Sequence, residues 1–220
     1  LKFFDFEVFP NWWCCVVSDE EPSYPGKLYD NKFDKKTEQK IKSKMRIYTS
    51  DSDLVEVRDA LKKELSTGVL CGYNIKRYDL MIAKCIFAGF TPEKLKKAND
   101  IIINPNLAYS NSEYARISEF IRFGWNRAQA WQDLYDDSEK GLKDKECALG
   151  MDIRETTVPF DKEDLTDKDK EEILFYCKHD VYALHVLYWT VSKAYIDTKI
   201  LLCDTFGIDR NIGYKNTNAN

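Results

Sequence analysis

The chain opens on an apolar segment that two carboxylates interrupt. In KFFDFEVF, residues 2–9, Asp5 and Glu7 would share one face of a strand with Phe3 and Phe9, while the other face would be entirely apolar. A strand that is apolar on both faces is typical of the inside of a sheet. Two acids about 7 Å apart there would repel each other unless a cation lies between them. The pattern favours a metal site, although this motif alone would also fit a solvated strand end.

A third carboxylate lies in a helical pattern near the C-terminal end. TDKD at residues 166–169 resembles a capping box with Asp in place of Glu, and a 3.6-residue period follows it. On this period Tyr176 and Asp180 stack on one face, with Asp180 at the edge of the buried stripe. A buried aspartate needs a cation or a salt bridge, for which Lys168 and Lys178 are nearby. The expected stripe is Ile173, Cys177, Val181, Leu184, Leu187, Tyr188 and Val191.

The segment GVLCGYNIKRYDLMIAKCIFAGF, residues 68–90, predicts a strand, a turn and a helix in succession. Asp79 would lie near the start of the helix, where a carboxylate complements the helix dipole. Asn74 would lie in the turn, and its amide suits either a turn or the binding of a nucleotide.

Together these motifs resemble a known family. The order D-x-E, N-x-x-x-Y-D and Y-x-x-x-D, spread over residues 2 to about 190, is similar to the three exonuclease motifs of the 3′→5′ proofreading domain of DNA polymerases, in the tyrosine variant of the DEDD superfamily. The surrounding stretches look most like bacteriophage family B polymerases. The histidine variant would carry its histidine where Phe175 stands, and His179 and His185 are interpreted as incidental.

The resemblance implies a two-metal phosphodiester hydrolysis that needs no side-chain nucleophile. It implies four ligands for two divalent cations, Mg²⁺ or Mn²⁺, namely Asp5, Glu7, Asp79 and Asp180. It also implies that Tyr176 orients the attacking water and that Asn74, helped by Tyr78, holds the terminal nucleotides of a single-stranded DNA 3′ end.

Two further candidates depend on less specific patterns. The phage relatives carry a lysine in a short basic motif, and Lys143 is the expected match among Lys140, Lys143 and Lys145, although a solvated helix face would explain these lysines equally well. Asp133 follows a plausible strand and could be a fifth acid or a strand-end residue, so it is left outside the metal set.

The composition is compatible with these expectations. The chain has 220 residues, 44% of them hydrophobic, enough for a full core. Its formal charge of −4 argues against a broad basic surface that binds nucleic acid, but a carboxylate site could still bind DNA through metal. Seven cysteines without a C-x-x-C pair, and no apolar run long enough for a membrane, favour a reducing cytoplasm, that of the host cell if the gene belongs to a phage. The chain is expected to be a monomer. Two alternatives remain open: a free-standing exonuclease acting on RNA, similar to RNase D, and a non-catalytic module that binds single strands.

The expected fold is α/β, a ribonuclease H-like mixed sheet flanked by helices. We expect an exonuclease domain over residues 1–206 and a polar tail over 207–220 that leads toward a polymerase domain of the same polypeptide. A loop or extended hairpin is expected from Ser18 to Lys44. The expected strands are Lys2 to Val8, Trp12 to Val17, Arg46 to Thr49, Val69 to Tyr73 and Arg127 to Leu134, and the expected helices are Asp53 to Leu65, Tyr78 to Ala88, residues 105–123 and Thr166 to about Phe206.

Overall fold

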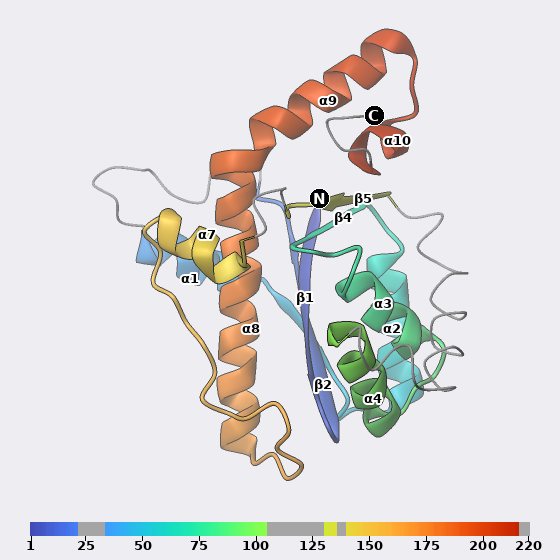
Figure 1. The fold of residues 1–220 in the computed structure, drawn as a ribbon, viewed down its shortest axis with the longest axis vertical. Coiled ribbons are helices and arrows are strands. Elements are labelled where there is room, and N and C mark those ends of the chain that lie inside the picture. The colour runs from blue at the N-terminus through green and yellow to red at the C-terminus, as the bar shows by residue number, and fades with distance from the viewer. Residues whose placement is uncertain (22–33, 105–129, 136–139, 216–220) are drawn as a thin grey trace.

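The centre of the molecule is a five-stranded mixed sheet (Figure 1). The computed structural model describes residues 1–21, 34–104, 130–135 and 140–215. Its strands are β1 (Lys2–Phe9), β2 (Trp12–Asp19), β3 (Arg46–Thr49), β4 (Val69–Gly72) and β5 (Ala130–Asp133). They lie in the order β3-β2-β1-β4-β5, with antiparallel pairing in β3-β2-β1 and parallel pairing in β1-β4-β5. With helices on both faces, this is the α/β fold with a ribonuclease H-like mixed sheet that the sequence predicts.

The alternating side chains of β1 separate two hydrophobic clusters. Phe3 and Phe9 belong to one cluster, whereas Phe4 and Phe6 belong to the other, and all four are buried. β1 lies in the middle of the sheet, between β2 and β4. The prediction of an inner strand is therefore confirmed, and its two acids lie on the face that carries Phe3 and Phe9.

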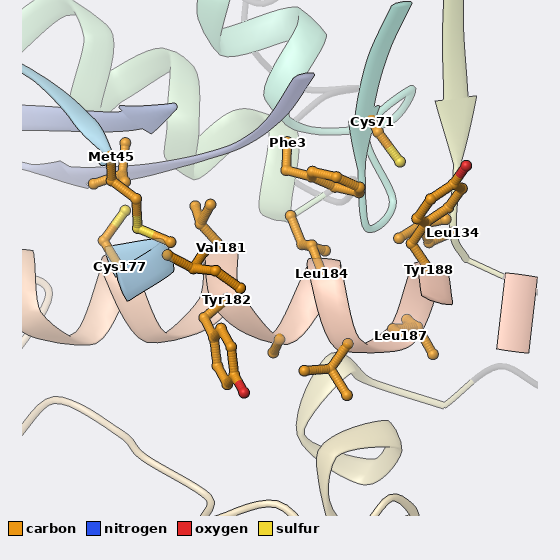
Figure 2. Close-up of a cluster of buried hydrophobic side chains, with 14 of the residues drawn as sticks. Phe3, Met45, Cys71, Leu134, Cys177, Val181, Tyr182, Leu184, Leu187 and Tyr188 are labelled. Carbon is orange, nitrogen blue, oxygen red and sulfur yellow. The ribbon is translucent and has the colours of Figure 1, made fainter. Parts of the chain in front are cut away.

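Helices cover both faces of the sheet (Figure 1). The Phe4 side is covered by α2 (Leu54–Leu65), α3 (Asp79–Phe87) and α4 (Pro92–Ile103). The Phe3 side is covered by the long helix α8 (Asp167–Leu187), against which α1 (Lys35–Ser43) and α7 (Leu142–Ala148) pack. Figure 2 shows Val181 and Leu184 pointing from α8 toward the strand that carries Phe3.

Helix α8 begins as the sequence predicts. The Thr166 side chain accepts a hydrogen bond from the Asp169 backbone N–H, and the Asp169 carboxylate accepts one from the Thr166 N–H. The expected stripe is buried as far as Tyr188. The prediction that Val191 is buried is wrong, because its side chain is 56% exposed. It lies in a π-helical turn, Tyr188–Ser192, which breaks the 3.6-residue period of the stripe.

The chain then continues into α9 (Lys193–Phe206), which ends where Gly207 adopts φ 67°. The expectation of one or two long helices up to Phe206 is confirmed. A polar tail was expected after Phe206. This expectation is wrong for Arg210–Lys215, because these residues form the short helix α10, which packs against α9 and β5. A Cβ at Gly213 would collide with the sulfur of Cys203, so this packing depends on a residue without a side chain. Residues 216–220 lie outside the described part of the chain.

The loop expected between Ser18 and Lys44 is also wrong in part. Residues 35–43 form α1, whose start is capped by the Asp34 carboxylate accepting from the Lys36 N–H. Ile41 is the only buried residue of this helix, so α1 is stabilised by packing against the rest of the fold. A lysine-rich sequence gives no local sign of this packing. The other part of that loop, residues 22–33, is not described.

The remaining expectations have mixed outcomes. Within the described part of the strand expected from Arg127 to Leu134, β5 covers Ala130–Asp133 and leaves out Leu134. The helix expected over residues 105–123 lies outside the described residues. Helix α4, with Pro92 in its first turn and Thr91 as its cap, was not predicted. Among the described helices, none is both long and apolar enough to cross a membrane.

Candidate metal centre

Three carboxylates from two elements meet beside the middle of the sheet. β1 supplies Asp5 and Glu7, and α8 supplies Asp180 from the helix that covers the same face. One oxygen of each carboxylate lies within 4.8 Å of one oxygen of each of the others. The structure thus brings together residues that are more than 170 positions apart, and the cluster could hold a metal ion.

Burial makes this cluster unfavourable without a cation. Glu7 and Asp180 are 7% and 6% exposed, and Asp5 is partly buried. Desolvation, followed by the charge of Asp180, raises the pKa of Asp5 to about 8. Desolvation and the charge of Asp5 raise the pKa of Glu7 well above its ordinary value. Desolvation also raises the pKa of Asp180 to about 6, although Lys143 acts in the opposite direction. A bound cation would relieve this repulsion.

Asp79 lies beside the cluster rather than within it. It is the first residue of α3, is 2% exposed, and lines one cavity together with Asp5 and Asn74. Its pKa is raised well above the ordinary value by desolvation and then by the charge of Asp5. Its buried Oδ1 atom has no hydrogen-bond partner among the described residues. A hard oxygen atom left without a partner at this place fits a ligand of Mg²⁺ or Mn²⁺.

Lys143 places a positive charge at the cluster. Its ammonium group donates to Oδ1 of Asp180 and, at 3.1 Å, to Oε1 of Glu146. Of the three lysines considered in the sequence, it is therefore the one that reaches the acids. The salt bridge of Asp180 is made with Lys143, not with the nearby Lys168 or Lys178.

Glu146 and His179 are two functional candidates that the sequence analysis missed. Glu146 is fully buried in α7, and its Oε2 atom lies 3.7 Å from Nε2 of His179, which is 2% exposed. The interpretation of His179 as incidental is therefore incomplete. A signal was present, because Lys143 and Glu146 are three residues apart and lie on one face of a helix.

Tyr176 lies one turn before Asp180 on α8, as predicted. Its hydroxyl group lies near the Asp180 carboxylate and lowers the pKa of that group, and its ring lies 4.7 Å from the ammonium nitrogen of Lys143. Desolvation, followed by the charge of Asp180, raises the pKa of Tyr176 well above its ordinary value. The hydroxyl therefore stays protonated and can both donate and accept a hydrogen bond.

The turn before α3 carries Asn74, which adopts φ 57°. The Asp133 carboxylate accepts hydrogen bonds from the backbone N–H groups of Lys76 (3.4 Å) and Tyr135 (3.0 Å). Asp133 therefore supports this turn and is not part of the three-carboxylate cluster. Tyr78 lines the same cavity as Asn74, and its hydroxyl donates to Asn99 at 2.7 Å.

The acids open onto two neighbouring cavities. One, of about 270 Å³, is lined by Asp5, Glu7, Tyr176 and Asp180 together with Phe160 and other apolar residues. The other, of about 340 Å³, contains Asn74 and Asp79, and Asp5 lines both. No protein-family model, curated protein or solved structure matches this chain. What the fold and the geometry define is an α/β protein with a buried acidic cluster, accessible from a cavity, that could hold a metal ion.

Proposed function

We propose that this chain is a metal-dependent 3′→5′ exonuclease that removes nucleoside monophosphates from single-stranded or frayed DNA 3′ ends. The proposal rests mainly on one observation: Asp5, Glu7 and Asp180 converge within 4.8 Å and share cavities with Asp79 and Tyr176. These are the acids and the tyrosine on which the resemblance to proofreading domains depends.

The cofactor we propose is a pair of divalent cations, Mg²⁺ or Mn²⁺, held by Asp5, Glu7, Asp79 and Asp180. All four ligands offer the hard oxygen atoms that these ions prefer. Once bound, two such ions supply an activated water and stabilise the leaving 3′ oxygen.

The side chains around the acids suit the remaining tasks. The Tyr176 hydroxyl, beside Asp180, can orient a water molecule. The Lys143 ammonium can hold a phosphate oxygen, and the Asn74 amide can hydrogen-bond the terminal nucleotides, with the Tyr78 ring beside it in the cavity.

One aromatic residue at the cavity supports a nucleic-acid substrate. Phe160 is 50% exposed at the cavity wall, and its ring stacks on the fully buried Phe9 with 5.3 Å between centroids and 17° between planes. Such an anchored, exposed aromatic ring offers a surface for an unpaired base. On the resemblance to proofreading domains we further propose a single-stranded DNA 3′ end as the substrate, a polymerase domain of the same polypeptide as the partner, and the cytoplasm as the location.

The test is to incubate the protein with matched DNA and RNA strands labelled at the 5′ end. We expect Mg²⁺ or Mn²⁺ to produce a ladder that shortens from the 3′ end of DNA, and EDTA to abolish it. A mismatched end should be shortened faster than a matched one, because a matched terminus must first open at a cost of about a few kcal/mol. Faster cutting of RNA would favour the RNase D-like alternative, and binding without cutting would favour the non-catalytic module.

Replacing Tyr176 by phenylalanine should slow hydrolysis by roughly 10- to 10³-fold, the usual range for the loss of one positioned catalytic group. The affinity for Mn²⁺ should stay unchanged, because we assign no ligand role to the hydroxyl group. Tyr195→Phe, on the exposed side of α9, is the matched control and should retain the full rate. Equal rates for the two variants would reduce Tyr176 to a packing residue.

A further inference from the structure

Glu146 is a fully buried glutamate with two well-defined neighbours. Its Oε1 atom accepts a hydrogen bond from Lys143 at 3.1 Å, and its Oε2 atom faces Nε2 of His179 at 3.7 Å. Burying a carboxylate costs several kcal/mol, and the hydrogen bond from Lys143 to Oε1 offsets part of this cost, while Oε2 makes no hydrogen bond among the described residues. The Lys143 ammonium is therefore shared between two buried acids, Glu146 on α7 and Asp180 on α8.

The orientation of His179 is set from α1. The Nδ1 atom of His179 lies 3.4 Å from the Lys42 ammonium, which itself pairs with Glu38. Because an ammonium group only donates, Nδ1 must be the acceptor when the two hydrogen-bond, and the ring proton then resides on Nε2. That nitrogen lies 3.7 Å from Oε2 of Glu146, close enough for electrostatic attraction but longer than a hydrogen bond, so the ring that α1 orients sits directly beside the Glu146 carboxylate.

We propose that Glu146 and His179 are positioning residues that tether Lys143 while Asp180 binds metal. This inference rests on the proposed function. The oxygen of Asp180 that accepts from Lys143 cannot at the same time serve a divalent cation without repulsion between the two positive groups. The hydrogen bond to Glu146 does not involve Asp180, so Lys143 can leave Asp180 and still stay beside the site. It is then free to meet the phosphate of the bound strand.

The tether predicts a particular pattern of metal affinities. Lys143 competes with the cation for Asp180, and Glu146 weakens that competition by holding the ammonium group elsewhere. Removing Lys143 should tighten metal binding. Removing the charge of Glu146 should weaken it, but only while Lys143 is present to compete.

Calorimetric titration with Mn²⁺ tests this through a double-mutant cycle. We expect Lys143→Met to tighten Mn²⁺ binding about tenfold, as for the loss of a charged hydrogen bond to the ligand. Glu146→Gln should weaken binding about fivefold in the wild-type background and less than about twofold in the Lys143→Met background. Glu171→Gln, an exposed glutamate on α8, is the control and should leave the affinity unchanged.

An equal effect of Glu146→Gln in both backgrounds would overturn the tether, since it would mean a direct electrostatic or structural effect. If Glu146→Gln does not fold, His179→Gln takes its place and should show the same dependence on Lys143. Measuring DNA cleavage by the same variants separates the two proposals. If the wild type cleaves DNA but the effects of the two substitutions on Mn²⁺ affinity are additive, only the tether is refuted. If the wild type does not cleave DNA, the exonuclease proposal is refuted, and the Mn²⁺ affinities alone decide whether the tether exists.

Discussion

Replacing Asp5 by asparagine should lower the rate of DNA hydrolysis by several orders of magnitude and at the same time stabilise the metal-free protein. Asp5 lies in both cavities and within the three-carboxylate cluster, so its loss would remove a proposed ligand from the centre of the site. Stability should rise because desolvation and the charge of Asp180 raise the pKa of Asp5 to about 8. At neutral pH the folded state therefore keeps Asp5 largely protonated, whereas the unfolded chain ionises it, and this difference destabilises the folded state by on the order of a few kcal/mol.

Both halves of this prediction can be measured on one preparation. The rate comes from shortening of a 5′-labelled single strand in Mn²⁺, and the free energy of unfolding from urea titration in EDTA. Asp152→Asn, an exposed aspartate outside the cavities, should change neither quantity. If the Asp5→Asn protein lost activity and was also unfolded, the result would point to a structural role and count against the metal assignment.

Local sequence patterns were sufficient where one period governs an element. Alternation placed Asp5 and Glu7 on the Phe3 face of an inner strand, and the helical period placed Tyr176 and Asp180 together on α8. The cap at Thr166 gave the start of that helix directly. In these segments the residues that determine the structure are close together in the sequence.

The parts that were missed depend on contacts between distant segments. α10 is short and polar, and it is helical where it packs against β5 and α9. The i,i+3 spacing of Lys143 and Glu146 was a weak local signal, and it could not show that Lys143 reaches Asp180, because that contact depends on α7 lying beside α8. Glu146 was missed for the same reason: a glutamate in a charged stretch is normally solvated, and only the packing of two helices buries it.

The second large effect should appear in the pH dependence of thermal stability. The pKa values of Asp5 and Asp180 in the folded state, about 8 and about 6, lie above the ordinary value of 3.8. Between about pH 4 and pH 8 the folded protein therefore binds more protons at these two groups than the unfolded chain does, and their contribution to stability is lost as the pH rises. In EDTA, the melting temperature should accordingly be lower at pH 8 than at pH 5.

Divalent metal should reverse this trend, because it binds the deprotonated carboxylates in competition with protons. We expect saturating Mn²⁺ to raise the melting temperature strongly at pH 8 and little at pH 5, followed by circular dichroism at both pH values. In Asp5→Asn the difference between the two shifts should shrink, because one of the competing groups is gone, while Asp152→Asn should behave as the wild type. Two results would contradict this account: a melting temperature in EDTA that rises from pH 5 to pH 8, or a Mn²⁺-induced increase of the same size at both pH values. Either would show that ionisation of the buried acids is not coupled to metal binding.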